Sequence, residues 1–367
     1  MTAELRGGDA VTVERALRSG ESLSGIDGFA GRLDDRLVRD VLGREPLFVD
    51  GDGWAFAPDE LDDPTPFPAG HAADRATLDG AAPLAEAETE RMLSLPDPEP
   101  VDRSDGVDRV GSALAGAESD VPDDCPVAFS GGVDSGTVAA MTGGPLYAVG
   151  FLGSHDLEAA REAVEAMDRR LCVVELTHDR LREAVPRVVA ATGRTNPMDV
   201  SIAVPLYVAA ERAAADGHDR LAVGQGADEL FGGYEKVASA PTDPRVSADT
   251  VREATREVVR GLPDQLARDV PLLRAAGVEP VAPFLRDKVI EAALRLPTGA
   301  LVADDQRKVA LRAAARPLVP ASVVERDKKA VQYGSYVARE LDRMARQEGF
   351  KRRMDDHVGE YVRSLVE

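Results

Sequence analysis

The sequence predicts an α/β protein whose larger part is a doubly wound parallel sheet, and three observations lead to this fold class. From about residue 100, short apolar runs alternate with amphipathic helical patterns, which is typical of βαβ units. Two glycine-rich loops follow two of the apolar runs, at the strand ends where open α/β sheets bind ligands. The 367 residues suit two domains, and 44% of them are hydrophobic, so the chain can bury a core.

The expected elements of the larger part follow one another in a regular order. Strands are expected at Val127–Phe129, Leu146–Phe151, Cys172–Leu176 and Leu221–Val223. Helices are expected at Gly136–Met141, Asp156–Met167, Asp179–Ala191, Ile202–Ala215, Val289–Leu296 and Gln306–Ala315, with an amphipathic tail over Val337–Glu367. Strands that alternate with helices pair in parallel. The apolar positions of the tail suit core or dimer contacts, so a homodimer is one expectation.

The first hundred residues have a different pattern. A short helix is expected near Val13–Arg18, a hairpin from Leu47–Val49 and Trp54–Ala57 around the turn Asp50–Gly53, and a helix at Leu84–Leu95. The prolines of Pro96–Pro100 block regular structure on both sides, which is typical of a linker. We therefore divide the chain into a small α+β domain at residues 1–95, a linker at 96–105 and a main domain at 106–367.

Composition restricts the function class and the compartment. A net charge of −21 disfavours nucleic acid or a membrane surface as a partner. The chain has six lysines, all at or after Lys236, and this acidic, arginine-rich composition is typical of proteins from salt-loving archaea, although an ordinary acidic cytoplasmic protein also fits. Cys125 and Cys172 have no metal-binding or disulfide spacing. No signal peptide and no membrane-spanning apolar run is seen, so we expect a cytoplasmic protein.

The first glycine loop, Ser130–Ser135, reads SGGVDS and joins a strand to a helix. Glycines let backbone N–H groups approach an anion, the helix N-terminus favours negative charge, and serine hydroxyls donate to phosphate oxygens. Asp134 is a poor phosphate contact by itself, so it suggests Mg²⁺ beside the phosphates. No Gly-Lys-Ser/Thr follows, so this is not a Walker loop. The alternative is an ordinary Gly-Gly turn with an Asp/Ser helix cap.

The second glycine loop, Gly224–Tyr234, reads GQGADELFGGY and contains the acid pair Asp228 and Glu229. Carboxylates beside a nucleotide loop suit Mg²⁺ that is shared with phosphate oxygens. The carboxyl ends of parallel strands lie at one edge of a sheet, so both loops can serve one site. The alternative is a helix start whose glycines serve packing.

SGGVDS followed about ninety residues later by GQGADELFGGY resembles the synthetase domain of the asparagine synthetase B family, an ATP pyrophosphatase type of fold (adenine nucleotide α-hydrolase-like) with a helical C-terminal part. Further segments resemble the family in the same order, over about residues 120 to 335: Val149–Ala160, Ile202–Tyr207, Gly277–Leu285, Arg307–Arg312 and Leu318–Lys328. The segment Lys328–Ser335 resembles a divergent branch, the asparagine synthetase domain-containing proteins.

The resemblance implies a carbon–nitrogen ligase that uses ATP and Mg²⁺. Attack of the aspartate carboxylate on the α-phosphate gives an acyl-adenylate and pyrophosphate, and ammonia then gives asparagine and AMP. The implied ATP-binding residues are Ser130, Gly131, Gly132, Val133, Asp134, Ser135, Val149, Gly150, Gly224 and Gly226, and the implied Mg²⁺ ligands are Asp134 and Asp228. Lys308 matches the catalytic lysine, which stabilises charge in both steps; the alternative is a solvent-facing helix lysine.

Three positions depart from the family pattern. Gln225 stands where the family has Glu, or Tyr in relatives that make β-lactams, and an amide cannot take a proton. Glu229 then serves instead, ammonia attacks without help, or the substrate differs. Arg286 and Val281 replace an aspartate and an arginine of the family pattern, so a carboxylate other than aspartate is the alternative substrate.

The N-terminal region resembles the rear half of an N-terminal-nucleophile glutaminase, through Arg39–Phe48, Trp54–Leu61 and Phe67–His71. The front half, with its glutamine pocket, has no room, and Thr2 stands where a cysteine nucleophile is expected. We expect no glutaminase activity, with nitrogen coming from free ammonia or from a separate glutaminase. A nucleotide-binding protein that has lost catalysis and acts as a partner or regulatory subunit is the second hypothesis.

Overall fold

The computed structural model describes residues 3–51, 53–74, 89–240, 248–304, 306–326, 333–353 and 355–366. The chain forms two compact units, each assembled from separate stretches. The first comprises Met1–Asp120, Gly224–Ala267 and Ala282–Pro317, and the second comprises Val121–Val223, Arg268–Val281 and Leu318–Glu367. The predicted division of the chain into a small domain, a linker at residues 96–105 and a main domain stays a prediction. No helix within the described ranges has both the length and the apolar character needed to cross a membrane.

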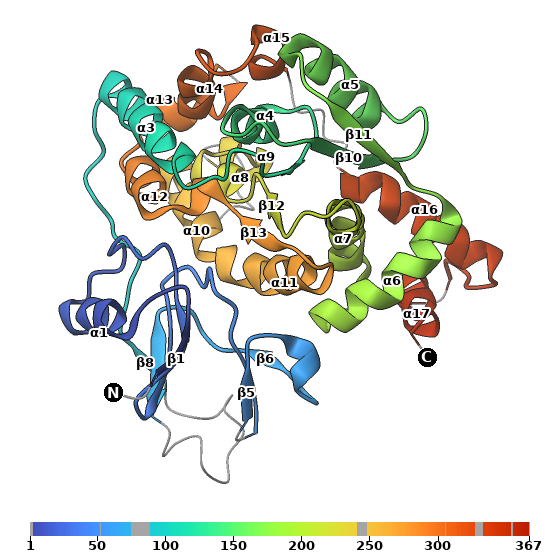
Figure 1. Ribbon diagram of the computed structural model, residues 1–367, viewed down its shortest axis with the longest axis horizontal. Coiled ribbons are helices and arrows are strands. Elements are labelled where there is room, and N and C mark those ends of the chain that lie inside the picture. The colour runs from blue at the N-terminus through green and yellow to red at the C-terminus, as the bar shows by residue number, and fades with distance from the viewer. Residues whose placement is uncertain are drawn as a thin grey trace. The chain divides into compact units, whose positions relative to one another are not determined.

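The second unit is built on a five-stranded parallel sheet with the strand order β11-β10-β9-β12-β13 (Figure 1). The strands are β9 (Val127–Ala128), β10 (Leu146–Gly150), β11 (Leu171–Glu175), β12 (Arg220–Ala222) and β13 (Glu279–Val281). From β9 the chain adds β10 and β11 on one side, and then returns to add β12 and β13 on the other. This reversal confirms the predicted doubly wound class. Open α/β sheets bind ligands outside the carboxyl ends of the two strands at the reversal, here β9 and β12.

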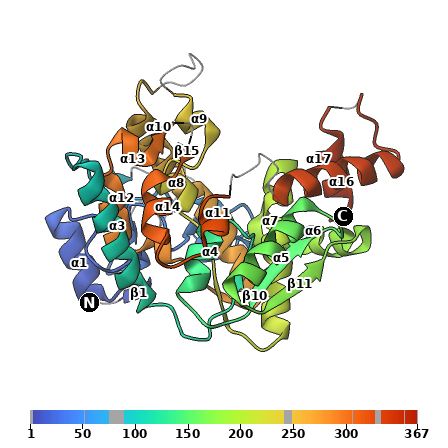
Figure 2. The ribbon, with the colours of Figure 1, turned by 90° about the horizontal axis from the view of Figure 1, so that it is seen from above.

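Helices pack against this sheet, whose inner strand β10 is apolar along its length. Every residue of β10 is buried, as expected for a strand packed on both faces. The helices are α4 (Val133–Ala140), α5 (His155–Met167), α6 (His178–Thr192), α7 (Pro197–Ala215), α15 (Ala321–Val324), α16 (Tyr333–Gln347) and α17 (His357–Ser364). Figure 2 shows α5 beside β10 and β11, and α7 also packs on strands β9 to β12. Helix α4 packs on β9, and α5 packs on β10 and β11.

Several helices begin earlier than the sequence pattern predicts, including α12 (Asp287–Leu294), which begins at Asp287 rather than at Val289. Helix α7 begins at Pro197 rather than at Ile202, because the Asn196 side chain caps it and Pro197 suits a first helical position. Helix α4 begins at Val133 rather than at Gly136. The shift of α4 places the aspartate and the second serine of SGGVDS in the first helical turn.

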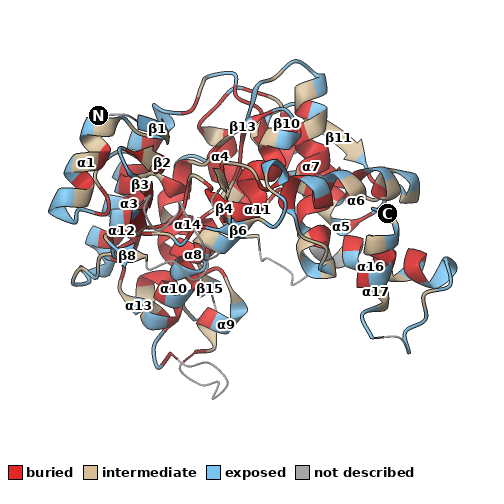
Figure 3. Cartoon of the chain, turned by 90° about the horizontal axis from the view of Figure 1, so that it is seen from below, coloured by how far each residue is buried: buried red, intermediate tan, exposed pale blue. Residues whose placement is uncertain are grey.

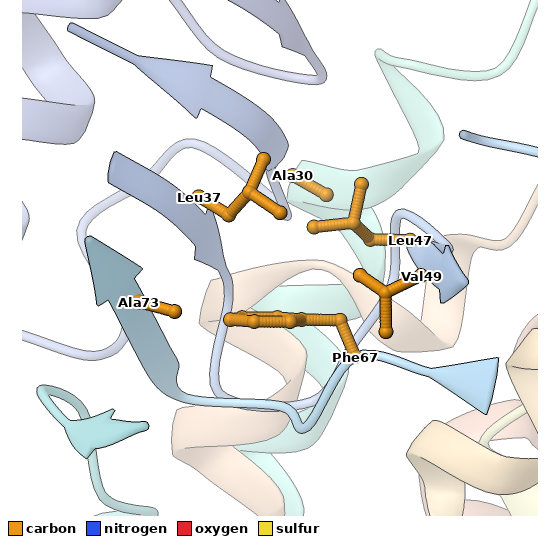
Figure 4. Packing of buried hydrophobic residues seen from close by; sticks show 6 residues of the cluster. All are labelled: Ala30, Leu37, Leu47, Val49, Phe67 and Ala73. Atoms are coloured by element: carbon orange, nitrogen blue, oxygen red, sulfur yellow. The ribbon is translucent and has the colours of Figure 1, made fainter. Parts of the chain in front are cut away.

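The N-terminal part of the first unit packs two small antiparallel sheets around one core. The first sheet has the order β1 (Ala3–Arg6), β2 (Ala30–Leu33), β3 (Arg36–Arg39), β7 (His71–Asp74), β8 (Glu90–Arg91), and the second has the order β5 (Gly53–Ala55), β4 (Phe48–Asp50), β6 (Thr65–Pro66). Figure 4 shows Leu37, Ala30 and Ala73 of the first sheet near Val49 of the second and near Leu47 and Phe67, which adjoin its strands. The predicted hairpin is confirmed, because β4 pairs with β5. Helix α1 (Ala10–Ser19) confirms the predicted N-terminal helix.

The helix predicted at Leu84–Leu95 is wrong over its described part. Residues 84–88 lie outside the described residues, and Glu90–Arg91 forms strand β8, which pairs with β7. Leu93 is fully buried and its N–H donates to the carbonyl of Gly70, so tertiary contacts override the helical spacing of this segment.

The rest of the first unit is mostly helical, with helices α3 (Arg103–Glu118), α8 (Ala227–Leu230), α9 (Glu235–Ala238), α10 (Val251–Arg260), α12 (Asp287–Leu294), α13 (Thr298–Leu301) and α14 (Val309–Ala315). The unit also contains the 3-10 turns η1 (Pro58–Glu60) and η3 (Pro283–Leu285) and the paired strands β14 (Val302–Ala303) and β15 (Gln306–Arg307). The chain passes into the second unit within helix α11 (Leu262–Ala275). Figure 3 shows that α14 is mostly buried, whereas α1 carries many exposed residues. The Pro96–Pro100 segment is irregular, as predicted, and Arg256 of α10 donates to the Pro96 carbonyl.

Candidate functional site

The SGGVDS loop lies in the second unit, between β9 and α4, and its two serines hold it closed. The backbone N–H of Ser130 donates to Ser135 Oγ at 3.1 Å, and the two hydroxyl oxygens are 3.1 Å apart. Ser135 is buried and also reaches the carbonyl of Gly132. The hydroxyl of Ser135 therefore shapes the loop, and its predicted contact with phosphate stays a prediction.

The two glycines of this loop differ in what requires them. Gly131 has φ +77°, and a Cβ there would lie 2.6 Å from the carbonyl oxygen of Ala159 in α5. Gly132 has φ −91°, and a Cβ there would meet only Ser130 Oγ, at 3.8 Å. Protein neighbours thus exclude a side chain at Gly131 but not at Gly132. A missing side chain at the start of a helix leaves backbone N–H groups open to an anion.

The start of α4 also differs from the starts of α5 and α6. Ser154 and Thr177 cap those two helices with their side chains, whereas Gly132 has no side chain with which to cap α4. Asp134 lies in the first turn of α4, beside these N–H groups. The local structure suits a phosphate with a metal ion beside it.

Val149 and Gly150 end β10, where the resemblance implies contacts with adenosine. Val149 is buried within the sheet. A Cβ at Gly150 would lie 2.9 Å from Leu157 Cγ, so packing on α5 already explains this glycine. The roles of both residues in binding adenosine stay predictions.

The GQGADELFGGY loop lies in the first unit and follows directly on β12 in the chain. Gly226 has φ +90°, and a Cβ there would lie 2.5 Å from Leu285 Cδ2, so this position requires glycine. Gly224 and Gln225 are half-buried. Asp228 and Glu229 follow in α8.

Lys308 is buried and binds the first of these acids. Its Nζ lies 2.7 Å from Asp228 Oδ1, and only 3% of the residue is exposed. The prediction that Lys308 lies within a helix over Gln306–Ala315 is wrong. Gln306–Arg307 forms β15, α14 begins at Val309, and Lys308 stands between them. The alternative of a solvent-facing helix lysine is also wrong, because Lys308 is buried and precedes the helix.

The backbone of Lys308 has φ +60° and ψ +37°, in the left-handed region. The other non-glycine residues with positive φ in the described part of the chain are all aspartates, which tolerate this region: Asp27, Asp34, Asp168, Asp304 and Asp356. For a lysine, this conformation costs about 1–3 kcal/mol and persists where the surroundings impose it, commonly at functional sites.

Gly233 makes room for the Lys308–Asp228 pair. A Cβ at Gly233 would lie 2.0 Å from Asp228 Oδ1 and 2.3 Å from Lys308 Cε. Arg307 Nη1 donates to the Gly233 carbonyl at 2.8 Å, which ties the glycine loop to the segment that carries the lysine. Sequence reasoning missed the role of Gly233, although the Gly-Gly pair after the acids was a visible signal.

Glu229 is buried and is engaged inside the first unit. The Tyr234 hydroxyl donates to Glu229 Oε1, and Gln265 also hydrogen-bonds to the carboxylate. Burial raises the pKa of Glu229, and the hydrogen bond from Tyr234 opposes that rise. A carboxyl with a raised pKa can exchange protons nearer neutral pH, but its role as a base stays a prediction, as does the role of Gln225.

Arg44 joins the N-terminal region to residues 285–287, where Leu285 packs against Gly226. Its Nη1 donates to the Leu285 carbonyl at 3.1 Å and to Asp287 Oδ1 at 2.5 Å, and its Nε donates to Asp40 Oδ1 at 3.0 Å. All three side chains of this triad are almost fully buried. Sequence reasoning missed this triad, because nothing in the chain order relates Arg44 to Asp287.

The carboxylates suit a magnesium ion that is shared with phosphate. Within the described ranges, no group of three or more His, Cys, Asp or Glu side chains could hold a metal ion. Mg²⁺ at nucleotide sites commonly takes one or two carboxylates and completes its shell with phosphate oxygens and water. Asp134 and Asp228 each offer carboxylate oxygens of this kind, and their role as Mg²⁺ ligands stays a prediction.

Comparison with known proteins shows similarity over most of this chain. The asparagine synthase family model matches residues 117–267 and 241–362. A protein of Methanocaldococcus jannaschii, named as a glutamine-hydrolyzing asparagine synthetase, is 29% identical over 274 residues, which cover 65% of this chain and 50% of that relative. The glutamine-hydrolyzing asparagine synthetase B of Escherichia coli is 28% identical over 232 residues, 58% of this chain and 41% of the relative.

A further relative has a different printed activity. The carboxyethyl-arginine beta-lactam-synthase of Streptomyces clavuligerus is 28% identical over 265 residues, which cover 70% of this chain and 49% of the relative. The chain spans about half the length of the curated relatives it matches.

Proposed function

Because this chain belongs to the asparagine synthase family, we propose that it is an ATP-dependent, AMP-forming ligase that joins ammonia to a carboxylate. One observation supports this proposal above the others. Lys308 is buried, has a left-handed backbone and binds Asp228 in a space that Gly233 leaves open. A cation held in this costly way is expected where negative charge develops during a reaction.

The proposed reaction has two steps. A carboxylate oxygen attacks the α-phosphorus of ATP, which gives an acyl-adenylate and releases pyrophosphate. The nitrogen lone pair of ammonia then attacks the acyl carbon, AMP leaves, and the ammonia nitrogen loses a proton. Lys308 would stabilise the negative charge of both transition states. Mg²⁺, when bound, supplies charge neutralisation at the phosphates.

The N–H groups at the start of α4 and the loop Ser130–Ser135 would bind pyrophosphate. Val149, Gly150, Gly224 and Gly226 would contact adenosine. Asp134 and Asp228 would hold the metal ion. Glu229 would move the proton that ammonia loses, because burial raises its pKa towards neutrality.

Aspartate is the proposed acyl substrate, and another carboxylate is the alternative. Two observations favour the alternative. Gln225 cannot act as a base, and Arg286 binds Asp27 at 3.0 Å, where the family pattern has an aspartate. The buried acid of this segment is Asp287, the next residue.

We further propose that ammonia arrives free or from a separate glutaminase, because the N-terminal region resembles only the rear half of a glutaminase. The proposed partners are small molecules, with no role for nucleic acid or a membrane surface, since the chain carries a net charge of −21. A cytoplasmic location and a homodimer stay predictions.

The test is an assay in high salt with ATP, Mg²⁺, ammonium and aspartate. We expect AMP, pyrophosphate and asparagine in equal amounts. AMP formation only with another carboxylate would retain the ligase and replace aspartate. Tight ATP binding without turnover on any acid would contradict the enzyme and favour the second hypothesis, a non-catalytic ATP-binding subunit.

A pair of glycine substitutions tests the phosphate loop. Gly132→Ala is expected to leave the stability of the protein unchanged, since its Cβ meets only Ser130 Oγ at 3.8 Å, but to weaken ATP binding at least tenfold. Gly131→Ala is expected to lower the unfolding temperature as well, because its Cβ would meet the Ala159 carbonyl at 2.6 Å. Calorimetric ATP titration and thermal unfolding measure both. Unchanged ATP affinity in Gly132→Ala would remove the loop from the site.

A further inference from the structure

A cavity of about 530 Å³ lies in the second unit, among residues to which we assigned no role. Three segments line it: residues 151–155 between β10 and α5, residues 177–178 at the start of α6, and one side of α16. Its volume falls within the range of about 300–1,000 Å³ that is typical of small-molecule sites. None of its lining residues belongs to the SGGVDS loop.

The α16 side of this cavity is cationic in a chain with 65 acidic and 44 basic residues. The Arg339 guanidinium lies over the Tyr336 ring, 4.5 Å from its centroid. No carboxylate in the described part of the chain forms an ion pair with Arg339. Arg343, one turn further on, reaches Glu340 only at 3.7 Å.

Glu340 offsets part of this charge. Its carboxylate lies 2.7 Å from His178 Nε2 on the opposite wall of the cavity, and it is the only acid among the lining residues. Arg343 thus has one carboxylate at 3.7 Å, and Arg339 has no ion pair within the described residues. Guanidinium groups offer fixed, paired N–H donors that match phosphate oxygens.

We propose that this cavity binds a small molecule through a phosphate group, which Arg339 and Arg343 hold. The guanidinium of Arg339 is already positioned by the Tyr336 ring, so little side-chain entropy is lost on binding. The two arginines are four residues apart on one helix and can contact the same group. With Glu340 counted, the arginines leave a net positive charge in the cavity, and their paired N–H donors match the several oxygens of a phosphate.

The cavity connects to the SGGVDS loop through one helix. Residues 151–155 lead directly into α5, and the Ala159 carbonyl of α5 lies so close to Gly131 that no Cβ fits between them. A ligand that holds the start of α5 in place also holds the part of α5 that packs against Gly131 of the loop. Occupancy of the cavity is therefore expected to strengthen ATP binding, and ATP is expected to strengthen phosphate binding by the same factor.

Calorimetric titration of the whole protein with inorganic phosphate tests this proposal. A non-hydrolysable ATP analogue and Mg²⁺ are added first, in excess, so that the loop is occupied. We expect one phosphate site in the unaltered protein, and at least a tenfold loss of affinity in the double variant Arg339→Gln/Arg343→Gln. Arg346→Gln is the matched control, because Arg346 lies on the same helix, pairs with Asp342 and does not line the cavity.

Several outcomes would overturn the proposal. Phosphate binding that the double variant retains would place the anion elsewhere. Loss of phosphate binding in the presence of the analogue would show that ATP itself occupies the cavity. Succinate binding as tight as phosphate binding would overturn the assignment of a phosphate group. If the analogue itself does not bind, the proposed function fails instead, and titration without it still tests the cavity.

Discussion

Replacement of Lys308 by glycine is expected to lower the kcat of AMP-forming turnover by about 10²- to 10³-fold. The reason is the loss of the buried cation that we place at the developing negative charge. Glycine is the informative choice, since it adopts φ +60° without strain, whereas alanine would combine the loss of the charge with a strained backbone. ATP binding is expected to persist, because the loop that we assign to the phosphates is Ser130–Ser135.

Single-turnover release of pyrophosphate and ATP titration together separate these effects. Lys308→Arg is also expected to lower turnover, because Lys308 is buried and Gly233 packs closely on its Cε, so the bulkier guanidinium would be crowded. Lys351→Ala is the control, since Lys351 is an exposed lysine outside any site we propose. Full turnover in Lys308→Gly would remove Lys308 from the chemistry.

The sequence predicts the second unit well because its signals are local. Four of the five strands are short apolar runs, so the order of these elements follows from the chain itself, whereas the edge strand β13 (Glu279–Val281) has no such run and was not predicted. The reversal of strand order at β9 and β12 was implied by the doubly wound class and is found in the sheet. The start of α7 depends on the side-chain cap at Asn196, and α4 begins directly after Gly132 without such a cap, so both boundaries move without changing an element.

The candidate site could be predicted only in part, because its geometry depends on contacts far apart in the sequence. The residue types of the two loops were visible, but the ion pair between Asp228 and Lys308 joins positions eighty residues apart, and no periodicity indicates a left-handed lysine. The helical pattern of residues 306–315 even predicted the wrong conformation for Lys308. Helical spacing reports which residues are buried, and it does not report the backbone conformation of a residue that another loop holds.

The N-terminal region shows the same limit. Its strands and hairpin follow from apolar runs and a turn, whereas the contacts of Arg44 with Asp287 and with the Leu285 carbonyl do not. These contacts give the N-terminal region a structural role in the first unit. Leu285 packs against Gly226, so the N-terminal region supports the loop Gly224–Tyr234, which carries Asp228 and Glu229.

Replacement of Arg44 by methionine is expected to lower the free energy of unfolding of the first unit by about 3–5 kcal/mol. The change leaves Asp40 and Asp287 buried without their shared cation, and it leaves the Leu285 carbonyl without its donor. Trp54, the single tryptophan, lies in β5, so its fluorescence during urea titration reports the unfolding of this unit.

Arg36→Met is the matched control for this measurement. Arg36 pairs with Asp74 and Glu90 at the surface, where both carboxylates are about two-thirds exposed, so the expected loss is about 0–1 kcal/mol. If Arg44 supports Gly226 through Leu285, then Arg44→Met also lowers turnover at temperatures well below its unfolding transition, whereas Arg36→Met does not. Equal stability of the two variants would show that the buried triad contributes no more than a surface pair, and normal turnover in Arg44→Met would separate the N-terminal region from the acid loop.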